Sequence, residues 1–188
     1  MEEPATIPFP ALVPMEYEFV GGTHFYVRAC YTEYYEYLFT NLLGGQTLPG
    51  QGVRNIRGVN VTGTPAACIN PTYGAVGIGK SVFMAYTFQR YSREHPGATV
   101  IMASYTNQSE LKRLVIAQGG KEIRRVVNRS QSAMMDLMAT YIETENDSTI
   151  CLLDGLPRNP PEDVRWMAFC SPNERWSRKL QKNFTITS

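Results

Sequence analysis

The chain has 188 residues, of which 43% are hydrophobic and 19% are charged, and its formal net charge is +1. This length and composition favour one folded domain with a sizeable core and exclude a globally disordered chain. The nearly balanced charge gives no overall electrostatic reason to bind nucleic acid, although it leaves room for a local basic patch.

Residues 1–22 are rich in proline, and we expect them to form a disordered leader in front of a domain that spans residues 23–188. The leader carries acidic residues where a secretory signal peptide is basic, and no apolar run reaches membrane-spanning length. Apolar and aromatic residues then recur at helical spacing, which predicts a helix from about Tyr31 to Leu43. Its tyrosines are expected in the core or at a docking surface, with base stacking as the alternative; they are Tyr31, Tyr34, Tyr35 and Tyr37.

The middle of the chain alternates between the patterns of strands and helices. Residues 56–62 predict a short strand, and residues 80–94 predict an amphipathic helix. Residues 98–105 form a continuous apolar run, which is typical of a strand buried on both faces. The two runs that flank Gly119-Gly120 predict a hairpin, and residues 132–142 predict a helix. The buried side of the helix predicted over residues 80–94 is expected to contain Val82, Phe83, Tyr86 and Tyr91.

The last part of the chain contains two more runs typical of buried strands, residues 149–155 and 164–173. A basic helix is expected over residues 174–183, with a solvated face as its expected role and phosphate or nucleic-acid binding as the alternative. Strands that alternate with helices predict an α/β fold, in which helices flank a mostly parallel sheet.

One motif carries most of the chemical information. Residues 74–81 (GAVGIGKS) match the P-loop pattern G-x-x-x-x-G-K-[ST] in full. Its glycines let successive N–H groups point at phosphate oxygens, and the helix that begins there directs its positive dipole end at them. Lys80 would place a compact charge near the β- and γ-phosphates, and the Ser81 hydroxyl is an expected Mg²⁺ ligand. A glycine-rich turn before an ordinary helix is disfavoured, because a strand precedes the motif and an amphipathic helix follows it.

Two polar residues are expected at the ends of later strands. The carboxylate of Asp154 can reach the metal side of a nucleotide, or it starts the turn at Gly155. Because no Asp-Glu pair is present here, an obvious base for an attacking water is missing, and fast hydrolysis is not expected. Asn173 would touch the γ-phosphate or orient a water, or it would cap the terminal helix.

These observations define a predicted site for ATP or GTP with Mg²⁺. The residues expected to bind the nucleotide are Gly74, Gly77, Ile78, Gly79, Lys80, Ser81 and Val82. The catalytic set is Lys80, Asp154 and Asn173, and Ser81 and Asp154 would hold the metal. A zinc site is not expected, because the cysteines and histidines lack zinc-binding spacing.

Six segments occur in a familiar order: FYVRACYTEYY (25–35), VTGTP (61–65), GIGKSVFMAYTFQRY (77–91), TVIMASY (99–105), ICLLDGLP (150–157) and AFCSPNERW (168–176). Together they resemble the P-loop NTPase domain of the Crinkler (CRN) effectors of oomycetes and some fungi, to which a domain of the trypanosome retrotransposon hot spot proteins is related. The resemblance runs from about residue 24 to the C-terminus.

The resemblance implies an ATP- or GTP-binding NTPase module of a secreted effector that acts in host cells, often in the nucleus. It carries over Gly77, Gly79, Lys80 and Ser81 for phosphate and magnesium, Asp154 for the metal side, and Asn173 as a sensor. The family's N-terminal ubiquitin-like domain and its C-terminal toxin domain are not visible in this chain, so we expect the module to be incomplete.

The family pattern runs V-T-G-T-P-G-I-G-K-S without interruption, whereas here VTGTP stops at Pro65 and GIGKS resumes at Gly77. The residues between them, 66–76, look inserted, so both Gly63 and Gly74 are candidates for the first glycine of the loop. Surface loops tolerate insertion at a modest entropic cost, but catalytic loops tolerate misplacement badly. We therefore expect nucleotide binding in weakened form and poor hydrolysis.

Two other functions are compatible with the sequence. One is a non-catalytic module that contacts a host protein through the aromatic helix, and the other is a nucleic-acid-binding fragment that uses the basic terminal helix. The sequence indicates no membrane partner and does not determine the oligomeric state.

Overall fold

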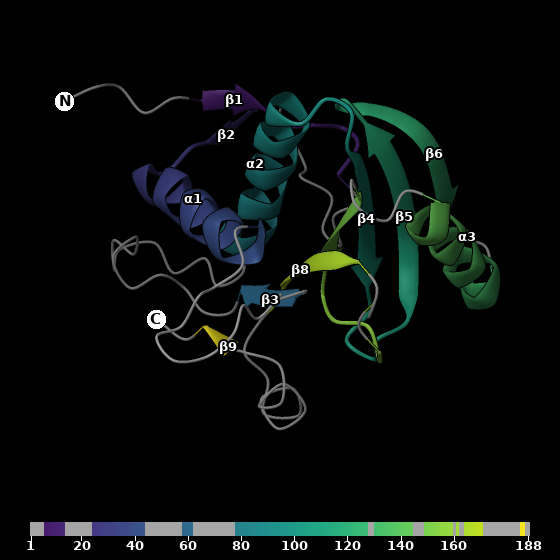
Figure 1. The fold of residues 1–188 in the computed structure, drawn as a ribbon. Coiled ribbons are helices and arrows are strands. Elements are labelled where there is room, and N and C mark those ends of the chain that lie inside the picture. The colour runs from purple at the N-terminus through teal and green to yellow at the C-terminus, as the bar shows by residue number, and fades with distance from the viewer. Residues whose placement is uncertain are drawn as a thin grey trace, which may run out of the picture.

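The computed structural model describes residues 6–13, 24–43, 58–61, 78–127, 130–144, 149–159, 161, 164–170 and 185–186. These residues form an α/β fold in three layers, with α1 and α2 on one face of a seven-stranded sheet and α3 on the other (Figure 1). None of the described helices is long and apolar enough to cross a membrane.

The sheet is mixed and has the strand order β6-β5-β4-β7-β8-β3-β9. The neighbouring strands from β4 to β9 in this order are parallel, and β5 and β6 continue the sheet beyond β4 as an antiparallel hairpin. The strands are β3 (Gly58–Val61), β4 (Thr99–Tyr105), β5 (Leu111–Gln118), β6 (Lys121–Val127), β7 (Thr149–Asp154), β8 (Arg165–Phe169) and β9 (Thr185–Ile186).

The expectation of a mostly parallel sheet is wrong, because the predicted hairpin belongs to this sheet. Gly119 and Gly120 connect β5 to β6 with φ angles of 54° and 75°. Two consecutive positive φ angles twist a two-residue turn in the sense that antiparallel strands need, and glycine adopts them without strain. The hairpin therefore forms where the sequence predicts it, and β5 then pairs with the free edge of β4.

The three helices lie where the sequence predicts them, with bounds that differ by a few residues. They are α1 (Ala29–Leu43), α2 (Ile78–Glu94) and α3 (Gln131–Thr144). All four residues expected on the inner side of α2 are buried, namely Val82, Phe83, Tyr86 and Tyr91. The expected helix over residues 174–183 lies outside the described residues.

Part of the expected disordered leader is structured. β1 (Thr6–Pro8) pairs in antiparallel fashion with β2 (His24–Tyr26), and Val13 is buried. Ile7 and Phe9 pack against the same core cluster as α1 and α2, so burial of apolar side chains holds this segment in place despite its prolines. The expectation of disorder is therefore wrong for residues 6–13.

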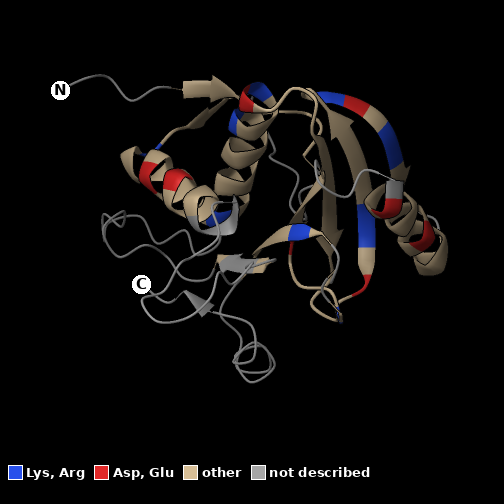
Figure 2. Cartoon of the chain, in the orientation of Figure 1, with Lys and Arg blue, Asp and Glu red and all other residues tan. Residues whose placement is uncertain are grey.

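Two apolar clusters fill the spaces between the sheet and the helices. Alternate residues of β4 and β7 point to opposite faces, so that Met102 and Leu152 pack beneath α1 and α2 while Ile101 and Cys151 pack beneath α3. Charged side chains lie along β6 and on the helices, whereas β4 carries none (Figure 2). Strand β4 is thus buried on both faces, as its apolar run predicts.

Candidate functional site

The carboxyl ends of three parallel strands stop at the same level of the sheet. Asp154, the last residue of β7, is in register with Phe169, the last residue of β8, and Phe169 is in register with Val61, the last residue of β3. On its other side Asp154 is in register with Ser104 of β4. Because open α/β sheets bind ligands outside the carboxyl ends of their strands, this edge is the candidate site.

Helix α2 begins at this edge and places the last residues of the P-loop pattern beside Asp154. The hydroxyl of Ser81 donates a hydrogen bond to Oδ1 of Asp154 at 3.3 Å, across 73 residues of sequence. Both side chains are half-buried. The structure therefore brings together the two residues that the sequence predicts as magnesium ligands.

Lys80 lies close to the same place. Burial raises the pKa of the Cys170 thiol, which follows β8, to about 11, while the Lys80 ammonium lowers it and the Asp154 carboxylate raises it. Lys80 directly precedes Ser81 in the first turn of α2, Asp154 ends β7, and Cys170 directly follows β8, so all three belong to the carboxyl edge.

The first turn of α2 is anchored from outside by α1. The Tyr31 hydroxyl donates to the Gly79 carbonyl at 3.2 Å, and its ring lies 5.1 Å from that of Phe83 and 5.6 Å from that of Tyr86. Burial raises the pKa of Tyr31, with Arg28 opposing the shift, so its hydroxyl remains a donor at neutral pH. The expected core role is confirmed for Tyr31, which holds the helix end in position.

The other tyrosines of α1 divide between core and surface. Tyr35 is buried and packs against Phe39 with tilted rings whose centroids are 4.2 Å apart, and Tyr34 is half-buried against the same cluster. Tyr37 is 50% exposed. Neither Tyr31 nor Tyr35 presents a free ring face to a base, since both rings pack on neighbouring aromatic side chains.

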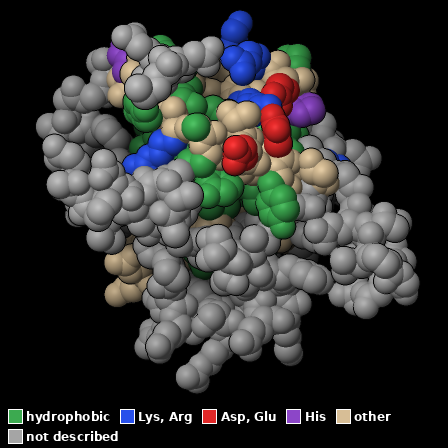
Figure 3. All heavy atoms as spheres, turned by 90° about the vertical axis from the view of Figure 1, so that its left-hand side faces the viewer, with side chains coloured by type: hydrophobic (Ala, Val, Ile, Leu, Met, Phe, Trp, Pro, Cys, Tyr) green, Lys and Arg blue, Asp and Glu red, His purple; other side chains and the backbone are tan. Residues whose placement is uncertain are grey.

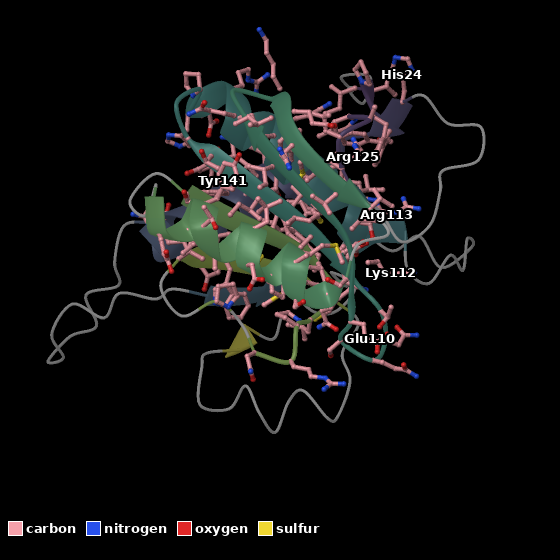
Figure 4. All side chains as sticks on the ribbon, turned by 90° about the vertical axis from the view of Figure 1, so that its right-hand side faces the viewer. His24, Glu110, Lys112, Arg113, Arg125 and Tyr141 are labelled. Atoms are coloured by element: carbon pink, nitrogen blue, oxygen red, sulfur yellow. The ribbon has the colours of Figure 1, made fainter. Side chains whose placement is uncertain are left out.

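Two residues at this edge are missed by the sequence reasoning. Ser104 ends the apolar part of β4 beside Asp154, and Arg113 of β5 is in register with Ser104 on the same face. Figure 4 shows Arg113 with Glu110 and Lys112 where the chain enters β5. The only signal in the sequence is a serine near the end of a buried run, and its position next to Asp154 depends on strand register.

Several predicted site residues lie outside the described part of the chain: Gly74, Gly77, Asn173 and the inserted residues 66–76. Ile78 is described only as the first residue of α2. The side chain of Val82 is buried in the core, so a contact of this residue with a nucleotide would come from its backbone.

The side chains at this edge suit magnesium. The Ser81 hydroxyl and the Asp154 carboxylate are hard oxygen donors only 3.3 Å apart, and Mg²⁺ in nucleotide sites takes one or two protein ligands together with phosphates and waters. Among the described residues, no group of three or more His, Cys, Asp or Glu side chains is placed to hold a metal ion by itself.

The chain was compared with family models, with curated proteins and with solved structures. None of the three comparisons found a match.

Proposed function

We propose that the chain is a P-loop module that binds ATP or GTP with Mg²⁺ at the carboxyl edge of its parallel strands. The observation that carries this proposal is the hydrogen bond of 3.3 Å between Ser81 and Asp154. Each residue belongs to a separate sequence pattern, one at the start of a helix and one at the end of a strand. Their meeting is what a shared magnesium site requires, and an isolated glycine-rich turn would not require it.

The local structure supports anion binding at the start of α2. Strand β3 precedes the motif and α2 follows it, which is the order that distinguishes a P-loop from a chance match. The first turn of α2 contains no acidic residue, although acidic side chains normally compensate the positive end of a helix dipole. It contains Lys80 instead, so a phosphate would supply the missing negative charge.

Weak hydrolysis is part of the proposal. Gly155 follows Asp154 with a φ of 90°, and a Cβ at this position would lie 3.2 Å from the Tyr105 carbonyl oxygen. A glutamate at this position would be strained, so the backbone favours glycine directly after Asp154, and glycine supplies no general base. When bound, Mg²⁺ would neutralise phosphate charge, while Lys80, Ser81 and Asp154 bind and orient the nucleotide.

The narrower proposal concerns the biological setting. The six segments that resemble the Crinkler family support a module of a Crinkler-like secreted effector that acts in host cells. Binding of a host protein or of nucleic acid remains an alternative use of the same fold, and it predicts partner binding that does not depend on Lys80.

Thermal unfolding tests the nucleotide proposal. At a concentration one hundred times the dissociation constant, Mg-ATP or Mg-GTP should raise the melting temperature by roughly 5–10 °C. Lys80→Ala should abolish the shift, because the ammonium that pairs with the phosphates is removed. Lys121→Ala is the matched control, since Lys121 is exposed at the turn between β5 and β6. If wild type fails to shift with either nucleotide, or if Lys80→Ala shifts like wild type, the proposal is wrong.

A further inference from the structure

Ser104 has a buried hydroxyl group that forms no hydrogen bond with the described residues. The residue is 0% exposed, and its Oγ has no hydrogen-bond partner among the described residues. Folded proteins pair nearly all such groups, because an unpaired buried hydroxyl has lost its bonds to water without replacement. An alanine would fill the same space without this loss, so the hydroxyl calls for an explanation.

The direction of the hydroxyl follows from the strand pattern. Val100 and Met102 belong to the cluster beneath α1 and α2, so Ser104, two residues further along β4, points to the same face. By the same alternation Asp154 points there after Ile150 and Leu152 of β7. The hydrogen bond from Ser81 of α2 to Asp154 agrees with this orientation.

Register then places the two side chains next to each other. Ser104 and Asp154 are paired residues on adjacent parallel strands, and such strands lie about 4.8 Å apart. One oxygen of the Asp154 carboxylate accepts the hydrogen bond from Ser81, but a carboxylate has about four acceptor positions. Two side chains on the same face of neighbouring strands at this spacing can reach each other, so a hydroxyl and a carboxylate placed in this way are able to form a hydrogen bond.

We propose that Ser104 is a positioning residue of the magnesium–nucleotide site. Its hydroxyl donates to the Asp154 carboxylate when that carboxylate faces the metal, and the bond fixes the carboxylate in the metal-facing orientation. The inference rests on the proposed function, because the metal-facing orientation of the carboxylate is favoured only when Mg²⁺ and a nucleotide are bound. It also gives a partner to a hydroxyl that the described residues leave unpaired.

Ser92 provides a matched control. It is 5% exposed, its Oγ also has no partner among the described residues, and it lies near the end of α2 that is remote from Ser81. Both Ser104→Ala and Ser92→Ala remove one buried unpaired oxygen atom, so both variants should fold at least as stably as wild type. Only the first removes a group beside Asp154.

The test is calorimetric titration of ATP into wild type, Ser104→Ala and Ser92→Ala. Each protein is titrated once with excess Mg²⁺ and once with EDTA in place of Mg²⁺. GTP is used as the ligand if only GTP raises the melting temperature. With Mg²⁺, Ser104→Ala should bind about three- to tenfold more weakly than wild type, the effect of one hydrogen bond. In EDTA the two should bind alike, and Ser92→Ala should match wild type in both conditions. The free Mg²⁺ concentration that half-saturates nucleotide binding should also rise in Ser104→Ala.

The outcomes separate the two proposals. If wild type binds neither nucleotide, the proposed function fails, and the role of Ser104 fails with it. If wild type binds in a magnesium-dependent way but Ser104→Ala has the same affinity within twofold, the role of Ser104 alone is wrong. A loss of affinity that persists in EDTA, or that Ser92→Ala shares, would show a packing effect and would overturn that role as well.

Discussion

Gly79 is a residue whose identity is not explained by packing against the described residues. It lies in the first turn of α2, its φ is not in the positive range, and a Cβ there would meet no described heavy atom within 4 Å. Glycine in a helix is less stable than alanine by about 0.5–1 kcal/mol, so the fold alone would favour a side chain. Close approach of a phosphate to the backbone would explain its absence.

Gly79→Ala should therefore separate folding from binding. We expect the free energy of unfolding to stay equal or to rise by up to about 1 kcal/mol, because alanine is the better helix former. Affinity for Mg-ATP should fall, because the new methyl group occupies the space next to the phosphates. Urea denaturation and calorimetric titration measure the two effects, and an alanine variant that binds as tightly as wild type would contradict the prediction.

Gly155 shows the opposite situation, in which the backbone demands glycine. Its φ is 90°, and a Cβ would lie 3.2 Å from the carbonyl oxygen and 3.3 Å from the Cβ of Tyr105. Gly155→Ala should therefore lower the free energy of unfolding by at least about 1–2 kcal/mol, the cost of a left-handed conformation for an L-residue. Gly97→Ala is the control, since a Cβ at Gly97 would meet no atom of the described residues within 4 Å. Equal stabilities of the two variants in urea would show that the predicted strain is absent.

At the scale of elements, α1 and α2 are joined by a polar cluster over their aromatic contacts. Tyr35 donates to Glu94 Oε2 at 2.6 Å, and Arg90 lies 4.3 Å above the ring of Tyr35. Arg90 also pairs with Glu94 at 2.8 Å and with Glu36 at 3.2 Å. In Figure 3 acidic and basic side chains gather in one patch on this side of the molecule. The cluster connects the helix that carries Lys80 and Ser81 to the helix that supports it.

The cluster makes stability depend on pH at its acidic end. Burial favours the neutral form of Glu94, but hydrogen bonds from Arg90 and Tyr35 outweigh it and hold the pKa of this carboxyl below 4.5. Its contribution is therefore fully present above pH 4.5 and is lost as the pH falls through the lower folded-state pKa. Glu94→Gln should lower the melting temperature at pH 7, and the difference from wild type should shrink below pH 4.5. A difference that does not change with pH would contradict this assignment.

Local sequence patterns are sufficient for the long elements and for β3, and insufficient for the two shortest strands, β1 and β9. The apolar runs of β4 and β7 and the periodicity of α1 and α2 are strong signals, because burial on two faces or on one stripe leaves a regular pattern. β1 and β9 have three and two residues, too few for periodicity, and partners distant in sequence define them. The attachment of the β5–β6 hairpin to β4 is likewise a tertiary choice that no local pattern records.

The candidate site divides in the same way. Lys80, Ser81 and Asp154 could be predicted because each sits in a local pattern, a P-loop or the end of a buried run. Ser104 could not be predicted as part of the candidate site, since only the strand register shows that this serine lies beside Asp154. The strain at Gly155 was equally invisible, because the sequence shows a glycine but not its φ.

At the scale of the whole molecule, the site depends on the complete sheet. The chain leaves β3, passes through α2 and enters β4, and only afterwards do β7 and β8 fill the positions between β4 and β3. The contact between Ser81 and Asp154 therefore depends on the position of β7 between β4 and β8. Because the proposed site exists only in the folded chain, a nucleotide bound there would stabilise the folded state, by about 2.7 kcal/mol at one hundred times the dissociation constant.

The connection from β3 to α2 should limit this binding. β3 ends at Val61, level with Asp154, and α2 begins at Ile78, so residues 62–77 span the two ends. Removal of residues 66–76 joins Pro65 to Gly77 and still leaves a complete P-loop pattern that starts at Gly63.

The shorter connection should bind Mg-ATP more tightly than the full chain. Because β3 and α2 are already in place in the folded chain, the gain comes from ordering fewer residues around the phosphates when the nucleotide binds. Each residue that need not be ordered saves roughly 1–2 kcal/mol, so the dissociation constant should fall by about fivefold or more. Calorimetric titration of the deletion variant measures the gain, and an unchanged affinity would mean that the inserted residues do not hinder the loop. Lys80→Ala in the deletion variant should abolish the gain in affinity, because the phosphates still need the Lys80 ammonium when the loop is shorter.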